Sequence, residues 1–152
     1  MVTITIDNKT ISAPEDSNLL KVARENGINI PGLCYHRKLT PTGACRLCLV
    51  KIDGIRRLVA SCTVKVNDGM NVTAFDEELE ETRKYLIDYL LSEHNDVYDG
   101  TYSDELRELM FRYELDNPEN RFFKPIWKDF SFIPDVSSPV LTYDPTKCIK
   151  CF

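Results

Sequence analysis

The sequence PGLCYHRKLTPTGACRLC, residues 31–48, places Cys34, Cys45 and Cys48 in one loop that also contains proline, glycine and charged residues. A fourth cysteine, Cys62, gives the overall spacing C-x10-C-x2-C-x13-C. Four unrelated core cysteines are disfavoured, because loops of this composition run over the surface of a domain. The spacing therefore indicates a disulfide framework, a zinc site or an iron–sulfur cluster.

Disulfides are disfavoured by the compartment that the N-terminus indicates. The sequence MVTITIDNKTI has neither the basic region nor the apolar stretch of a secretory signal. We therefore expect a cytoplasmic protein, in which reductants keep cysteine pairs open. The 6 cysteines of the 152-residue chain are then expected to be ligands or free thiols.

Charge and hydropathy argue against two classes of partner. The net charge is -5, and basic residues cluster only in short pairs such as Arg56-Arg57, so no nucleic-acid surface is expected. No apolar run approaches the roughly 20 residues that span a bilayer, so no membrane-spanning segment is expected.

Residues 1–75 carry the pattern of a small sheet. Apolar and polar residues alternate on both sides of Asp7-Asn8, and a second pair of strand-like segments is joined around Asp53-Gly54. Both dipeptides favour tight hairpin turns. The expected strand segments are residues 2–6, 11–13, 47–52, 57–61 and 71–75.

One helix is expected between the first hairpin and the cysteine loop. It carries Leu19, Leu20 and Ala23 on one face, Asp16 or Ser17 is its expected cap, and Gly27 ends it. The order of two strands, a helix, a long loop and three strands predicts an α+β domain of the β-grasp type, like that of [2Fe–2S] ferredoxins. Fold alone does not assign function.

The pattern changes after residue 75. Residues 76–115 are predicted to be a helical segment, because leucines recur at helical spacing through residues 77–94 and a shorter helix is indicated in 103–115. Residues 116–147 combine five prolines with aromatic residues, which predicts an extended arm. This arm either wraps on its own domain or docks on a partner.

The cysteine spacing favours iron–sulfur over zinc. A structural zinc site commonly uses two C-x2-C pairs, and only one is present here. A [2Fe–2S] cluster takes four thiolates, typically from one long loop and one later cysteine. Gly43 and Ala44 beside Cys45 let the backbone approach closely, so that amide N–H groups point at the sulfurs.

The motif P-G-L-C-Y-x7-G-A-C-R-L-C resembles the N-terminal [2Fe–2S] domain of the complex I 75-kDa subunit family. The same module opens catalytic subunits of many [FeFe]-hydrogenases and NAD(P)-linked formate dehydrogenases. The matching positions are Pro31, Cys34, Tyr35, Gly43, Cys45, Arg46 and Cys48, followed by Cys62 at the family's distance. The resemblance implies that Cys34, Cys45, Cys48 and Cys62 ligate one [2Fe–2S] cluster.

One family feature is missing from residues 76–115. In the family, the helix after the β-grasp domain ends in His-x3-Cys-x2-Cys-x5-Cys, which binds a [4Fe–4S] cluster. Here His94 is in register, but Tyr98, Thr101 and Arg107 occupy the cysteine positions. One imidazole is not enough for such a cluster. We therefore expect no metal at His94, which is favoured at a helix end by the dipole.

The last residues, 148–152, resemble the start of a ferredoxin-like C-x2-C-x2-C-x3-C motif, with only Cys148 and Cys151 present. Two thiolates do not close a [4Fe–4S] site. The favoured expectation is that the native protein continues with the missing cysteines. The alternatives are a vestigial pair of free or oxidised thiols, and a partner chain that completes the site.

The resemblance implies a one-electron relay in an NAD(P)H-, formate- or hydrogen-linked oxidoreductase complex. Its expected partners are other iron–sulfur or flavin subunits, and no substrate chemistry is expected in this chain. The alternative, from another class, is a structural or assembly subunit whose four cysteines hold zinc. A self-sufficient enzyme lacks support, because no nucleotide-binding fingerprint is present.

Overall fold

The computed structural model describes residues 1–94, 104–124, 133–145 and 148–149. These residues fall into two compact units, residues 1–83 and the described part of residues 84–150. None of the helices in the described ranges has both the length and the apolar character needed to cross a membrane.

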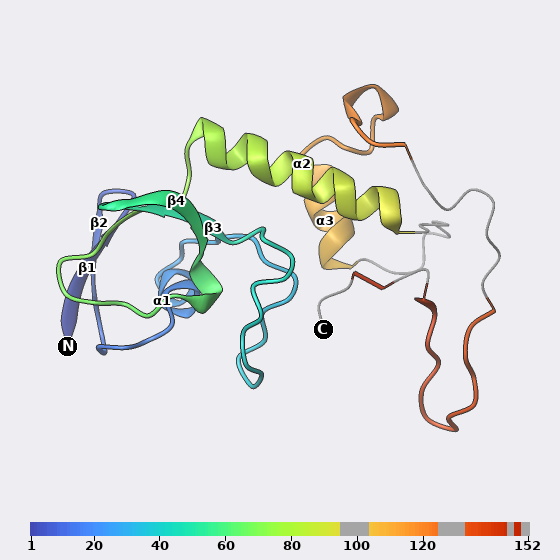
Figure 1. Ribbon diagram of the computed structural model, residues 1–152, viewed down its shortest axis with the longest axis horizontal. Coiled ribbons are helices and arrows are strands. Elements are labelled where there is room, and N and C mark those ends of the chain that lie inside the picture. The colour runs from blue at the N-terminus through green and yellow to red at the C-terminus, as the bar shows by residue number, and fades with distance from the viewer. Residues whose placement is uncertain (95–103, 125–132, 146–147, 150–152) are drawn as a thin grey trace. The chain divides into compact units, whose positions relative to one another are not determined.

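The first unit is built on a five-stranded mixed sheet (Figure 1). The sheet order is β2-β1-β5-β3-β4, with β1 parallel to β5 and the other neighbours antiparallel. The strands are β1 (Val2–Ile6), β2 (Lys9–Ala13), β3 (Leu49–Ile52), β4 (Ile55–Ala60) and β5 (Asn71–Thr73). With helix α1 (Leu19–Glu25) packed across the sheet, this arrangement confirms the predicted α+β class.

Both predicted hairpin turns are present. Asp7 and Asn8 adopt φ angles of 46° and 67°, the left-handed values that a two-residue hairpin turn requires of its central residues. Gly54 has a φ of 82° between the paired Ile52 and Ile55. These turns fix the register of the strands, and a shift of one residue would expose the buried face of the sheet.

Helix α1 begins later than the sequence indicates. Its N-cap is Asn18, whose side-chain oxygen accepts from the Lys21 N–H at 3.1 Å. The prediction of Asp16 or Ser17 as the cap is wrong. Asp16 takes a turn conformation with φ 62°, and the Ser17 hydroxyl donates to the Pro14 carbonyl at 2.6 Å.

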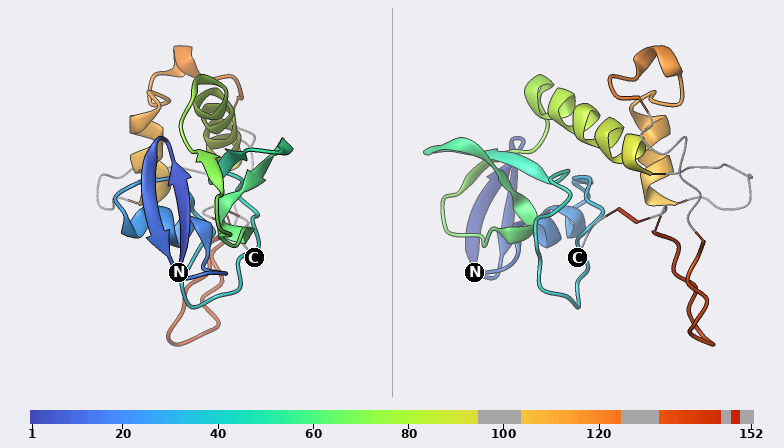
Figure 2. Two further views of the ribbon diagram at one scale, coloured as in Figure 1. Left: turned by 90° about the vertical axis from the view of Figure 1, so that its left-hand side faces the viewer. Right: turned by 45° about the vertical axis from the view of Figure 1, so that its right-hand side comes forward.

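The core of the first unit lies between α1 and the sheet (Figure 2). Ile4 and Ile6 of β1 and Leu19 and Leu20 of α1 are all at most 1% exposed. Cys48 and Cys62 belong to the same buried cluster. The thiols are therefore held by the packing of the whole domain and do not depend on the loop alone.

Helix α2 (Glu77–Glu93) supplies a fully buried arginine, Arg83, to the first unit. Its guanidinium donates to the carbonyls of Leu47 (3.0 Å), Leu49 (2.7 Å) and Ala74 (2.7 Å), and it pairs with Glu80. These carbonyls lie at the end of the cysteine loop, in β3 and after β5. The arginine thus replaces water as the donor to backbone groups that sheet pairing leaves unpaired.

The second unit contains helix α3 (Glu105–Arg112) and the short 3-10 helix η2 (Pro118–Asn120). Buried Asp88 of α2 pairs with Arg121 and accepts from the N–H groups of Phe122 (2.5 Å) and Phe123 (2.9 Å). Later in the predicted arm, Asp135 and Tyr143 exchange backbone hydrogen bonds of 2.8 and 2.9 Å. Of the predicted aromatic arm, Trp127, Phe130 and Phe132 lie outside the described residues.

Replacing Arg83 by methionine would keep the aliphatic packing and leave three buried carbonyls without their donor. Each unpaired buried polar group costs about 1–3 kcal/mol. We expect the free energy of unfolding, measured by chemical denaturation, to fall by about 3 kcal/mol or more. Arg56→Met in the exposed part of β4 is the matched control and should change stability by less than about 0.5 kcal/mol. Equal losses in the two variants would contradict this role of Arg83.

Candidate iron–sulfur site

The start of the cysteine loop is held by Arg24, in the last turn of α1. Its guanidinium donates to the Ile30 carbonyl at 3.1 and 3.2 Å and to the Gly32 carbonyl at 3.2 Å. The same group lies over the Tyr35 ring, 6.0 Å from its centroid. Helix α1 therefore fixes the chain on both sides of the first cysteine, Cys34.

Two left-handed residues shape the loop around Cys45. Gly43 has a φ of 64°, and a Cβ atom built on it would lie 3.2 Å from the Thr63 Cγ2 atom and 3.6 Å from the Ala60 Cβ atom. Glycine is thus required by conformation and by the close approach of the segment before and after Cys62. Arg46 has a φ of 58°, a conformation that costs a non-glycine residue about 1–2 kcal/mol.

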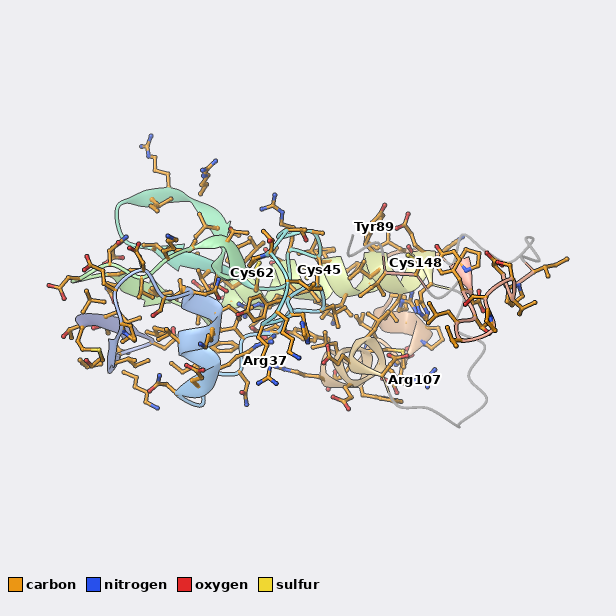
Figure 3. The ribbon with its side chains drawn as sticks, turned by 90° about the horizontal axis from the view of Figure 1, so that it is seen from below. Arg37, Cys45, Cys62, Tyr89, Arg107 and Cys148 are labelled. Atoms are coloured by element: carbon orange, nitrogen blue, oxygen red, sulfur yellow. The ribbon has the colours of Figure 1, made fainter. Side chains whose placement is uncertain are left out.

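The structure brings the four predicted cysteines together. Cys45, Cys48 and Cys62 are 7%, 1% and 0% exposed, and Cys34 is half-buried. The Cys34 side chain lies close enough to Cys45 to contribute to its raised pKa, and the Cys48 and Cys62 side chains shift one another's pKa in opposite directions. The two pairs also interact, because the charges of Cys34 and Cys45 contribute to the raised pKa of Cys62. Figure 3 shows Cys45 and Cys62 close to one another.

The thiols therefore associate two by two. Across the part of the chain that the structure describes, no three His, Cys, Asp or Glu side chains surround one point as ligands of a single metal ion would. A [2Fe–2S] cluster spreads four thiolates over two irons, and two neighbouring pairs suit that division.

The protonation states of the paired thiols are strongly linked. The Cys62 thiol donates to Cys48 and lowers the pKa of Cys48 to about 6, although burial opposes this. The hydrogen bond to Cys48 and burial raise the pKa of Cys62, and burial raises that of Cys45. Four thiolates in this interior would repel one another and be poorly solvated. A positively charged metal cluster offsets both penalties, so the donor set fits a cluster.

Several hydrogen-bond donors point at the sulfurs. The backbone N–H groups of Leu47, Cys34 and Leu33 act to lower the pKa of Cys45, although burial outweighs them. The backbone N–H of Cys62 acts in the same sense on Cys48. These donors lie elsewhere than Gly43 and Ala44, to which the loop sequence points. Such bonds stabilise negative charge on sulfur and so favour the reduced form of a bound cluster.

Ser61 and Asn18 are site residues that the sequence does not predict. The Ser61 hydroxyl donates to the Cys48 carbonyl at 2.8 Å and also lies within reach of the Cys48 sulfur. Because a hydroxyl has one proton, it can turn from the carbonyl to the sulfur when the sulfur becomes a thiolate. The Asn18 amide donates to the Cys62 carbonyl at 2.6 Å. The only sequence signal is the position of Ser61 beside Cys62 in the 3-10 helix η1 (Ser61–Thr63).

The second unit holds the residues of the incomplete family motif. His94 follows α2, and its Nδ1 atom is buried without a hydrogen-bond partner among the described residues. Arg107 is 9% exposed in α3, and Tyr98 and Thr101 lie outside the described residues. The absence of a cluster here stays a prediction.

Cys148 belongs to the incomplete ferredoxin-like motif. Its thiol is hydrogen-bonded to Tyr143, which raises the pKa of that phenol. Cys151 lies outside the described residues.

A β-grasp domain that gathers four cysteines, three of them buried, from a loop and a following turn is the architecture of a [2Fe–2S] protein. Residues 1–76 match the 2Fe-2S iron-sulfur cluster binding domain family. The chain belongs to this family, and its cofactor is a [2Fe–2S] cluster. Family membership thus favours iron–sulfur over the zinc alternative.

Several oxidoreductase subunits are similar to this chain over 99% of its own length. It is 45% identical to the gamma chain of the NAD-reducing hydrogenase HoxS of Cupriavidus necator, covering 62% of that protein. It is 35% identical to an NADH-quinone oxidoreductase subunit of Rhizobium meliloti, covering 18% of it. A solved NAD+-reducing [NiFe]-hydrogenase contains a chain with a TM-score of 0.83 and 30% identity, of which 62% is covered. The chain therefore spans less than two thirds of each of these relatives.

Replacing Ser61 by alanine should lower the midpoint potential of the bound cluster, on the order of tens of millivolts, because a donor to the Cys48 thiolate is lost. A potentiometric titration followed by electron paramagnetic resonance measures the shift. Ser61→Thr keeps the hydroxyl and is the matched control. An alanine variant with the wild-type potential would show that the hydroxyl serves only the Cys48 carbonyl.

Proposed function

We propose that the chain is a one-electron relay whose [2Fe–2S] cluster is held by Cys34, Cys45, Cys48 and Cys62. The observation that supports this most directly is the association of these four thiols, three of them buried, in two neighbouring pairs within one loop and the turn after β4. In the proposal, these four cysteines would hold the cluster together. When bound, the cluster supplies a centre that accepts and returns a single electron.

The protein's own groups would set how readily that electron is accepted. The hydrogen bonds donated to Cys45 and Cys48 stabilise the added negative charge. Burial of three of the four cysteines keeps water from the sulfurs. Arg83 and Arg24 hold the surrounding backbone, so little rearrangement accompanies a change of charge.

We further propose that this relay works in a larger oxidoreductase complex linked to NAD(P)H, hydrogen or formate. The relatives that match nearly the whole chain are named as subunits of an NAD-reducing hydrogenase and of an NADH-quinone oxidoreductase. On this basis the partners are other iron–sulfur or flavin subunits. A cytoplasmic location is part of the proposal.

The division of labour along the chain is also proposed. Residues 1–75 form the cluster domain, 76–115 a helical segment that has lost the cluster site of one histidine and three cysteines, and 116–147 an arm. Residues 148–152 resemble the start of a ferredoxin-like C-x2-C motif. The contact of Phe122 with Tyr85, at 4.3 Å between ring centroids, supports an arm that is anchored at its start within the second unit.

We expect the anaerobically isolated protein to contain two irons and two sulfides per chain and to give one [2Fe–2S] paramagnetic signal on reduction. Cys45→Ser should abolish or strongly perturb this signal, because a harder oxygen ligand replaces a thiolate. Cys148→Ser is the matched control and should leave the signal intact. Stoichiometric zinc without iron would refute the relay.

The second unit provides an independent check on the number of clusters. His94→Ala should leave the iron content unchanged, because one imidazole stands where one imidazole and three thiolates are needed. Metal analysis of this variant and the wild type makes the comparison. A loss of iron in the variant would show that the segment after α2 holds a metal.

A further inference from the structure

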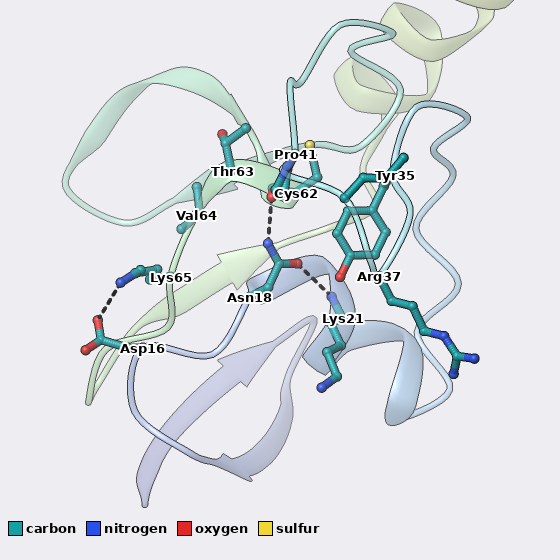
Figure 4. A pocket seen from close by; sticks show the side chains of 11 residues that line it. Asp16, Asn18, Lys21, Tyr35, Arg37, Pro41, Cys62, Thr63, Val64 and Lys65 are labelled. Carbon is teal, nitrogen blue, oxygen red and sulfur yellow. Dashed lines mark hydrogen bonds and ion pairs between the residues drawn. The ribbon is translucent and has the colours of Figure 1, made fainter. Parts of the chain in front are cut away.

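A pocket of about 480 Å³ opens beside the last cysteine of the site. Its walls come from the turn before α1, from residues 35–41 of the cysteine loop, and from residues 62–65. Figure 4 shows Asn18 and Cys62 near its centre, joined by their hydrogen bond, with Lys65 on one side and Lys21 and Arg37 on the other. We call it the cationic pocket. Its volume is that of a typical ligand site.

The charge of the pocket is opposite to that of the chain. Lys21, Arg37 and Lys65 line it against one carboxylate, Asp16. The chain as a whole has a net charge of -5 and 24 acidic residues, yet none of these lies in the loop of residues 31–48. Positive charge is thus concentrated beside the cysteines, where it would attract a negatively charged partner.

The cations of the pocket are available for binding. Lys21 lies 3.8 Å from Glu25 and Lys65 lies 3.7 Å from Asp16, and all four side chains are more than half exposed. Exposed ion pairs at such distances contribute little to stability, so the lysines can exchange their present partners for others. Arg37 forms no ion pair with any residue in the described ranges.

The pocket also has an apolar wall. Leu39 is 66% exposed and lies beside Pro41 and Val64. A small inorganic anion would gain nothing from contact with these apolar side chains. A protein surface that combines carboxylates with apolar side chains would use both the cations and the wall.

The pocket gives a short route between the cluster site and solvent. Cys62 lines the pocket although it is 0% exposed, and Asn18 connects the Cys62 carbonyl to the first turn of α1. Residues 35–41 follow Cys34, and residues 63–65 follow Cys62, so two of the proposed ligands lead into the pocket wall. Electron transfer slows steeply with distance, which favours a crossing point where a ligand comes closest to a bound partner.

We propose that the cationic pocket is the docking site for an acidic, carboxylate-bearing surface of the protein that exchanges electrons with the cluster, and that the electron crosses at Cys62. This inference rests on the relay function proposed above. One electron passes between the reduced cluster and the partner's oxidised redox group, and no proton or covalent bond is transferred.

The first test uses charged oxidants with the full chain carrying its reduced cluster. In stopped-flow measurements at low salt, Arg37→Glu and Lys65→Glu should each slow oxidation by the ferricyanide anion by about tenfold and speed oxidation by the hexaamminecobalt(III) cation. Both effects should fade as salt rises. Arg57→Glu, an equal charge change on the exposed part of β4, is the matched control and should have a much smaller effect.

Equal effects of Arg37→Glu and Arg57→Glu would overturn the proposal, because only net charge would then matter. The iron content and the reduced-state signal of each variant are measured first. A chain without a reducible [2Fe–2S] cluster refutes the relay itself, whereas a normal cluster without a local charge effect refutes only the docking site.

The second test distinguishes a protein surface from a small carboxylate. A short polyglutamate peptide should slow oxidation by ferricyanide in the wild type and lose this effect in Arg37→Glu. Free glutamate at the same concentration of carboxylate groups should have little effect. Equal competition by free glutamate would overturn the acidic protein surface as the occupant, and no competition by the peptide would do the same.

Discussion

The buried guanidinium of Arg83 is the interaction on which the arrangement of the cysteine site depends. Burying a charge is unfavourable unless its hydrogen bonds are completed. Here the donors of Arg83 reach the carbonyls of Leu47, Leu49 and Ala74, and the group lies over the Phe75 ring, 5.0 Å from its centroid. These acceptors come from the end of the cysteine loop, from β3 and from the residue after β5. The loop can therefore hold unusual conformations because its end is fixed to the sheet.

The electrostatics of the site follow from that rigidity. Neighbouring buried thiols resist joint ionisation, so the pKa of Cys48 is lowered while that of Cys62 is raised. A fixed backbone prevents the sulfurs from moving apart to relieve this repulsion. Hydrogen bonds from the loop offset part of the penalty, and a cationic cluster offsets the rest. The apoprotein is thus arranged for a charge that the thiols themselves do not supply.

The sequence predicts the local features of this fold better than its long-range contacts. The turns at Asp7-Asn8 and Gly54 follow from residues that tolerate left-handed conformations. The cap of α1 is harder to predict, because Asp16, Ser17 and Asn18 are adjacent and all can cap a helix. Contacts between residues far apart in the chain help to select Asn18, among them the hydrogen bond from its amide to the Cys62 carbonyl. The four cysteines could be predicted because ligand spacing is a local pattern, whereas their supporting residues could not.

Arg83 is an example of such a supporting residue. It stands four residues after Leu79 on the apolar face of α2, and both side chains are fully buried. The sequence does not show that the partners of Arg83 are three backbone carbonyls.

The second unit also contains a buried charged side chain whose hydrogen bonds are completed, in this case an acidic one. Asp88 is fully buried, and its carboxylate pairs with Arg121 and accepts from the N–H groups of Phe122 and Phe123. A buried carboxylate needs such donors to complete its hydrogen bonds. Two ring contacts, Tyr85 with Phe122 and Tyr89 with Phe123, flank this group. The buried carboxylate of Asp88, with its hydrogen bonds and the two ring contacts, therefore joins residues 121–123 to helix α2.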